Sequence, residues 1–250
     1  MNVYDFISIK IIILQSQILG NMAKKTDKTE DRIVAVEEAF SKTEHFIEQN
    51  QKIILIVVAA IVVVVLGFFG FKRFYLAPKE KEAQGQMFMA EKYFEMDSIN
   101  KALNGDGNYP GFLEIMDQYG ITKCANLAHY YAGICYLKKG EFEKAIDYLK
   151  HFKGKDEMVG PMATGAIGDA YMELGETEKA VDYYLKGADQ RKNDFTTPLL
   201  LQKAGWAYEE LGKYEDALKV YKRIKNEYLR STEAREIDKY IGKMEALVKK

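Results

Sequence analysis

Three stretches of the sequence repeat one four-residue pattern, and this repetition constrains the fold more than any other feature. The pattern is a glycine, a tyrosine three residues later, a second glycine four residues after that, and an alanine five residues further on. Successive copies begin 35 and 37 residues apart, which is typical of stacked helix pairs and predicts an all-α solenoid of helical hairpins. The twelve positions are Gly133, Tyr136, Gly140, Ala145, Gly168, Tyr171, Gly175, Ala180, Gly205, Tyr208, Gly212 and Ala217.

Each position of the pattern has a steric reason. The first glycine and the alanine let two helices approach closely, and the tyrosine shares that face and is expected to fill the space between pairs. The second glycine supplies the left-handed residue that ends one helix before the next begins. Pro161 and Pro198 each stand seven residues before a repeat glycine, and proline is tolerated in the first turn of a helix. One unit is therefore predicted to be a helical hairpin.

These residues resemble the tetratricopeptide repeat (TPR), whose pattern places a small residue, a tyrosine, a glycine, an alanine and a late aromatic at these spacings. The late aromatic position holds Leu149, Tyr184 and Tyr221. The family's final proline is absent from all three copies. The resemblance implies a TPR-type α-solenoid, a fold in which the first helix of each pair lines a concave groove.

A weaker copy of the pattern precedes the three regular ones. Ala90 and Tyr93 keep the small–aromatic spacing, but Asp97 replaces the turn glycine. A turn-rich insertion follows at 104–111, and we expect the second helix to resume near Phe112.

The end of the stack needs a cover, because a solenoid exposes apolar surface at its ends. Ser231 or Thr232 is expected to cap a last helix that supplies this cover. We therefore assign the TPR domain to 79–250, with a divergent repeat at 83–122, regular repeats at 126–159, 161–195 and 198–230, and a capping helix at 232–250.

The block from Ile53 to Phe71 contains no charged or polar side chain. As a helix it extends about 28 Å, close to the thickness of a hydrocarbon core. Lys52 precedes it, and Lys72 and Arg73 follow, where cations reach lipid headgroups. We predict a single transmembrane helix at 53–71. About fifty residues precede the block, which argues against a cleavable signal peptide.

The residues before this block fall into two parts. Met22 reads like a natural start, so 1–21 is interpreted as an upstream extension or a disordered segment, with an interfacial segment as the alternative. The sequence leaves the start open between Met1 and Met22. The part at 22–52 is expected to be amphipathic, with one helix face formed by Ile33, Val36, Phe40 and Ile47.

Composition limits the chemistry that the chain can perform. The 36 Lys and Arg residues nearly balance 37 Asp and Glu residues, so no basic field favours a nucleic-acid partner. Cys124 and Cys135 would lie about 16 Å apart on one helix, too far for a disulfide, and His129 and His151 have no partner at metal-ligand spacing. We expect no enzyme activity, cofactor, metal or small-molecule substrate.

The predicted groove is therefore the candidate site, and its partners are expected to be other proteins. Lys138 is its only cation by this reasoning, which disfavours a clamp for a terminal carboxylate. The predicted lining is acidic with apolar and aromatic patches, suited to an extended or helical segment. As alternatives to partner contact, Trp206 packs inside the protein and the glutamates form a solvated face. The candidate groove residues are Tyr130, Ile134, Asp169, Met172, Gln202, Trp206 and Glu209, with Met87, Glu91, Phe94, Lys138, Glu173 and Glu210 at further groove positions.

The layout of an N-terminal helix, one membrane segment and a repeat domain resembles the YfgM-like ancillary subunits of the Sec translocon, over roughly Ile33 to Lys250. In that family the repeats lie outside the inner membrane and help to pass emerging proteins to periplasmic chaperones. The resemblance implies a single-pass inner-membrane scaffold with a periplasmic TPR domain, which holds client proteins or chaperones near the translocation machinery. The local count of Lys and Arg leans slightly the other way, toward a cytoplasmic domain.

Two alternatives remain at this point. One is a structural subunit of a cell-envelope, cell-division or outer-membrane assembly complex, in which the solenoid packs permanently. The other is an adaptor that faces the cytoplasm.

Overall fold

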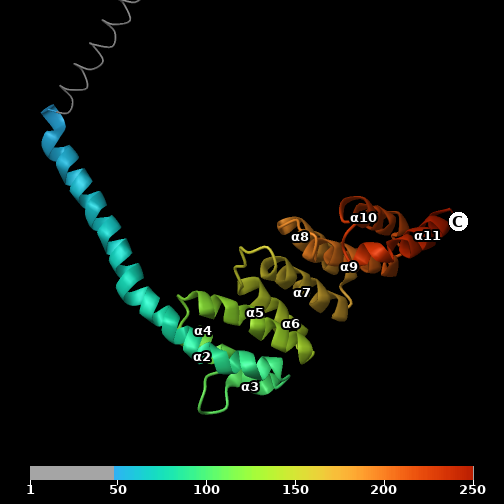
Figure 1. The fold of residues 1–250 in the computed structure, drawn as a ribbon, viewed down its shortest axis with the longest axis horizontal. Coiled ribbons are helices and arrows are strands. Elements are labelled where there is room, and N and C mark those ends of the chain that lie inside the picture. The colour runs from blue at the N-terminus through green and yellow to red at the C-terminus, as the bar shows by residue number, and fades with distance from the viewer. Residues whose placement is uncertain (1–47, 250) are drawn as a thin grey trace, which may run out of the picture. The chain divides into compact units, whose positions relative to one another are not determined.

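The computed structural model describes residues 48–249. The chain divides into two compact units, 1–70 and 71–250, and each is described by itself. In the first unit, residues 48–70 are helical (Figure 1). The helix that contains them, Glu48–Glu95, is the one helix of the described part that is long and apolar enough to cross a membrane, and none of its most apolar window is buried. The predictions for 1–21, and nearly all of those for 22–52, lie outside the described residues.

The second unit is built of helices, and residues 48–249 include no strand. This confirms the predicted all-α class. Pro78 lies in the first turn of α2, and a π-helical turn precedes it, as expected where proline removes a backbone donor and its ring clashes with the preceding turn. The elements are η1 (Phe71–Leu76), α2 (Ala77–Glu95), α3 (Ile99–Asn104), α4 (Phe112–Gln118), α5 (Lys123–Lys138), α6 (Phe142–His151), α7 (Val159–Glu173), α8 (Thr177–Gln190), α9 (Thr196–Glu210), α10 (Tyr214–Glu227), η2 (Glu233–Arg235) and α11 (Ile237–Val248).

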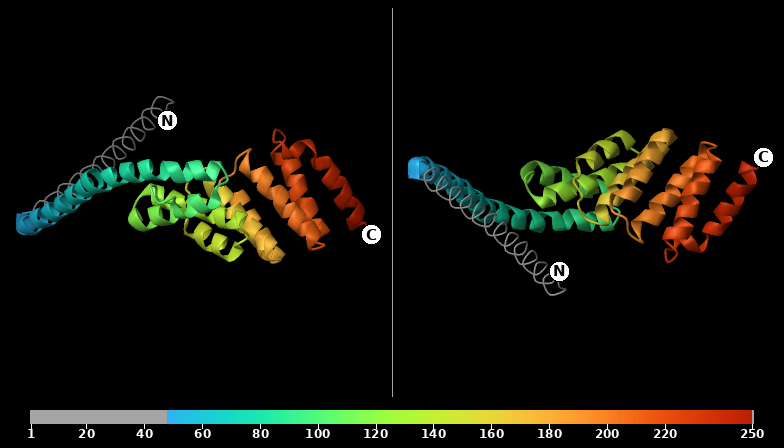
Figure 2. Two further views of the ribbon diagram at one scale, coloured as in Figure 1. Left: turned by 90° about the horizontal axis from the view of Figure 1, so that it is seen from below. Right: turned by 90° about the horizontal axis from the view of Figure 1, so that it is seen from above.

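The helices α5 to α10 form three hairpins that follow one another along the chain (Figure 2). Within each hairpin the first repeat glycine lies against the late aromatic position of the second helix. A Cβ on Gly133 would lie 2.5 Å from Leu149 Cγ, and one on Gly168 would lie 2.7 Å from Tyr184 Cδ1. A Cβ on Gly205 would overlap the ring of Tyr221 in the same way. The three glycines thus occupy equivalent seams.

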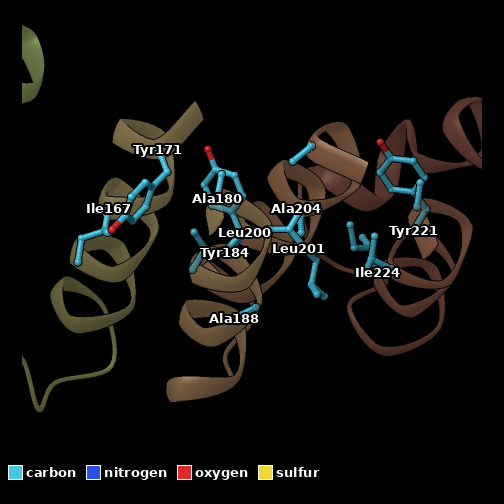
Figure 3. Close-up of a cluster of buried hydrophobic side chains, with 14 of the residues drawn as sticks. Ile167, Tyr171, Ala180, Tyr184, Ala188, Leu200, Leu201, Ala204, Tyr221 and Ile224 are labelled. Atoms are coloured by element: carbon cyan, nitrogen blue, oxygen red, sulfur yellow. The ribbon is translucent and has the colours of Figure 1, made fainter. Parts of the chain in front are cut away.

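The buried side chains continue from one hairpin to the next. Figure 3 shows Tyr184 and Leu200 on neighbouring helices of one cluster, with Ala180 beside them. Ala145, Ala180 and Ala217 are completely buried, which leaves room for the larger side chains across the seam.

The pattern tyrosines pack differently from our expectation. The Tyr136 ring lies 5.1 Å from Tyr148, and the Tyr171 ring lies 5.3 Å from Tyr183. Both partners belong to the second helix of the same hairpin, so these rings fill space within a pair. Tyr208 is only partly buried.

The second pattern glycine ends the first helix of each hairpin. Gly140, Gly175 and Gly212 have φ of +75°, +74° and +70°. At Gly140 the backbone N–H donates to Leu137 O, and the next N–H donates to Tyr136 O, which is the Schellman arrangement. The divergent repeat uses the same turn with Asp97 at φ +56°, as a short polar side chain allows.

Both ends of the stack differ from a regular hairpin. The insertion splits the second helix of the first repeat into α3 and α4, and α4 begins at Phe112. At the other end, Ser231 Oγ accepts from Ala234 N and so caps the short helix η2. The long helix α11 therefore begins at Ile237 rather than at residue 232, and it buries Ile237, Ile241 and Met244.

Candidate functional site

A pocket of about 650 Å³ lies between successive hairpins. Most of its lining comes from the first helices α5, α7 and α9, the elements that line the predicted groove. The second helices contribute one ring each from α6 and α8. The lining residues are Leu137, Lys138, Gly140, Phe142, Asp169, Met172, Glu173, Tyr184, Lys203 and Trp206.

The structure brings three of the seven candidate groove residues into this pocket: Asp169, Met172 and Trp206. Two further groove positions, Lys138 and Glu173, line it as well. The other four candidates lie outside its lining: Tyr130 and Ile134 are partly buried against the core, and Gln202 and Glu209 are partly buried on α9.

Asp169 is held by two partners from different helices. Its Oδ1 accepts from the Tyr184 hydroxyl at 2.7 Å, and Lys203 Nζ lies 2.7 Å from both carboxylate oxygens. Burial raises the pKa of the Tyr184 phenol, and the charge and hydrogen bond of Asp169 raise it further. This phenol is therefore a permanent donor at neutral pH.

Glu209 repeats this arrangement one hairpin later. Its Oε1 accepts from the Tyr221 hydroxyl at 2.6 Å, and its Oε2 pairs with Lys243. In both cases the tyrosine is the late aromatic of the same repeat, and the lysine follows its acid by 34 residues. We call each of these a Tyr–acid–Lys bridge.

The bridges correct the expectation of an acidic lining. Sequence reasoning missed Lys203, although its spacing of 34 residues from Asp169 is close to the repeat period. With Lys203 and Lys138 facing Asp169 and Glu173, the pocket carries two charges of each sign. Lys138 also pairs with Asp97 at 2.7 Å. Because its charges are balanced, the pocket offers no strong field to a charged partner.

The apolar side of the pocket is formed by Leu137, Phe142, Met172 and Trp206. Trp206 is 43% exposed, and its ring centroid lies 6.4 Å from that of Tyr240. A large, partly exposed aromatic in a pocket that a methionine also lines is typical of an anchor for a partner's side chain.

The two cysteines of α5 are buried and free. Burial raises the pKa of both the Cys124 and the Cys135 thiols to about 12. They are therefore protonated at neutral pH and are poor nucleophiles. His129 Nδ1 is buried without a hydrogen-bond partner, and its ring stacks on His151 at 5.6 Å. Among residues 48–249, no three His, Cys, Asp or Glu side chains are grouped as metal ligands.

Stacked hairpins, each with a left-handed glycine between its two helices, define the molecule's class as an α-solenoid. Tetratricopeptide repeat models match residues 127–155, 165–194 and 200–228, which are the three regular hairpins. The chain therefore carries tetratricopeptide repeats, a family of protein-interaction scaffolds that are generally without catalytic activity.

A crystal structure of nearly identical TPR-like repeats from a putative kinesin light chain of Podospora anserina is similar to the chain, with 11% identity and a TM-score of 0.49. The match covers 68% of this chain and 88% of that one. No curated protein matches the chain.

Proposed function

We propose that the protein is a membrane-anchored TPR scaffold that holds a protein partner in the pocket between α5, α7 and α9. The observation that carries this proposal is the exposed ring of Trp206, which faces a pocket that successive repeats build together. The repeats supply an interaction fold, and the helix through residues 53–71 is long and apolar enough for an anchor.

The chemistry of the pocket favours a partner with an apolar anchor. Leu137, Met172 and Trp206 offer apolar surface, whereas Asp169 is already satisfied by Tyr184 and Lys203. A partner gains little by replacing these internal bonds, because it must first desolvate a paired charge. We therefore propose a short extended or helical segment with an aromatic or aliphatic residue at its centre.

The proposal also includes the protein's location in the cell, which is supported by the resemblance of its layout to the YfgM-like subunits. We place the protein in an inner membrane with its repeats in the periplasm, near the translocation machinery, where clients or chaperones are the partners. Protease added to spheroplasts should then digest the repeats rapidly. Resistant repeats would support the cytoplasm-facing adaptor instead.

The groove is tested by photo-crosslinking in cells. A photoreactive residue at Trp206 or Met172 should give specific adducts, and the same residue at Lys186, exposed on α8, should not. If neither pocket position gives adducts, or if all three positions give equal amounts, binding in the pocket is ruled out. A stable large assembly of the full chain on size exclusion would favour the structural-subunit alternative.

A further inference from the structure

Four exposed apolar side chains recur in the connections between hairpins. Met158 and Phe195 each stand ten residues before a repeat glycine, and Ile121 and Leu229 occupy the connections before α5 and η2. Their exposed fractions are 56% for Ile121, 47% for Met158, 73% for Phe195 and 73% for Leu229. We call these four residues the loop row.

The connections that present this row are ordered by their own hydrogen bonds. Asp156 Oδ1 accepts from Met158 N at 2.9 Å, and Asn193 Oδ1 accepts from Phe195 N at 2.9 Å. Each of these oxygens also accepts from the next backbone N–H, at the start of α7 or α9. The two apolar side chains are therefore held outward by fixed turns that cap the following helix.

Hydrogen bonds also link the connections side by side from α5 to α9. Asn126 bonds to the backbone of Lys153, at 2.9 Å for the Lys153 N–H, and Asn193 Nδ2 donates to Glu157 O at 2.9 Å. These bonds join the start of α5 to the α6–α7 connection, drawn in yellow in Figure 1, and that connection to the next. The connections that carry Met158 and Phe195, and the start of α5 after Ile121, are thus linked side by side.

The first turn of α2 is linked to the start of α5 in the same way. Glu80 Oε2 accepts from Lys123 N at 2.7 Å, and its Oε1 accepts from Cys124 N at 3.2 Å. The N-terminal ends of α2 and α5 are therefore adjacent, and in the sequence α2 follows the apolar run that ends at Phe71.

The residues around the row suit a lipid surface. The four connections, at 119–122, 152–158, 191–195 and 228–232, contain five basic residues and three acidic ones. Phe74 and Tyr75, between the apolar run and α2, are exposed aromatics of the kind found at membrane interfaces. Single apolar tips flanked by cations insert into the boundary between headgroups and acyl chains.

We propose that the loop row is a second membrane contact, which seats these connections of the solenoid on the surface of the bilayer that anchors the chain. The contact rests on the proposed membrane anchoring. It would hold the connections against lipid and leave the pocket beside Trp206 open to a partner.

The test uses the full chain in nanodiscs, with an environment-sensitive fluorophore on a single introduced cysteine. Positions 158 and 195 report on the row and position 68 on the span. Met96 is a matched control, because it is 63% exposed and apolar but lies in the turn after α2, at the opposite end of that helix. The unsubstituted chain measures labelling of the buried Cys124 and Cys135.

Spin-labelled lipids should quench the labels at 68, 158 and 195 by about twofold or more and leave the label at 96 unchanged. Quenching at 68 without quenching at 158 and 195 would overturn the loop-row contact and leave the anchor intact. If the label at 195 is shielded from aqueous iodide but is not quenched by spin-labelled lipid, the loop row contacts protein instead of lipid. This result would also overturn the proposal. No quenching at 68 would overturn the anchor itself.

Discussion

At the scale of single residues, glycine has two opposite roles in this protein. Gly168 faces the ring of Tyr184 across a seam, where a Cβ would overlap buried atoms. Gly85 and Gly242 lie in helices α2 and α11, and a Cβ on either would meet nothing within 4 Å. The surroundings of each glycine decide whether it is required or merely tolerated.

We therefore predict opposite effects for the same substitution. Gly168→Ala should lower the free energy of unfolding by about 1–3 kcal/mol, because it overpacks a seam. Gly85→Ala should raise it by about 0.5–1 kcal/mol, because alanine restricts the unfolded chain and favours the helix. Thermal and urea unfolding measure the free energy of unfolding of the two variants. Equal changes in both variants would contradict the close packing of Gly168 against Tyr184.

His129 provides a second prediction at this scale. Burial lowers its pKa, the neighbouring His151 lowers it further, and Asp147 opposes this. Since the folded pKa lies below the unfolded value of about 6.5, the folded state disfavours the proton. The stability that His129 contributes is present above the unfolded pKa and is lost as the pH falls through 6.5 toward the folded pKa.

The change that tests this is His129→Phe, which keeps an aromatic ring beside Tyr148. When the pH is lowered from 7 to 5, the unfolding free energy of this variant should decrease less than that of the parent chain. His151→Gln should retain most of the parent's dependence, because burial of His129 is the leading cause of its shift. An unchanged pH dependence in His129→Phe would refute the assignment.

At the scale of elements, the Tyr–acid–Lys bridges join consecutive repeats. In one bridge the acid and the lysine come from the successive first helices α7 and α9, and in the other they come from α9 and the capping helix α11. In both, the tyrosine comes from the second helix between them. Tyr184 and Tyr221 are 3% and 0% exposed, so each hydroxyl depends on its acid for a partner. A buried hydroxyl that loses its partner is costly.

The bridge is measured by a double-mutant cycle between Asp169→Ala and Tyr184→Phe. We expect a coupling of about 1 kcal/mol, because each single change removes the same hydrogen bond. Glu209→Ala with Tyr221→Phe should give a coupling of the same sign. Additive single effects at both sites would show that the bridges do not stabilise the stack.

At the scale of the whole molecule, the stack is held by contacts between neighbours. The buried residues form two clusters that meet at α6, one from α2 to α6 and the other from α6 to α11. In such an array, a change at one end destabilises its own neighbours most.

We predict this behaviour for Met244→Ala. Met244 is completely buried on α11, and its truncation should cost about 2–5 kcal/mol. Hydrogen exchange should accelerate in α9, α10 and α11, while α2 to α5 keep their protection. Uniform acceleration across the stack would indicate one cooperative unit instead of a chain of neighbours.

The sequence by itself determined the all-α class, the repeat and the apolar block, because small residues at a fixed period and an uninterrupted apolar run act through local geometry. Sequence reasoning found Asp169, Met172 and Trp206 as pocket residues, since their register follows from the repeat. Only the tertiary structure decided that Lys203 neutralises Asp169, that Glu209 is occupied by Tyr221 and Lys243, and that the connections carrying Met158 and Phe195 lie side by side. These outcomes depend on the angle between successive hairpins, which is set by packing across seams and has no local signature in the chain.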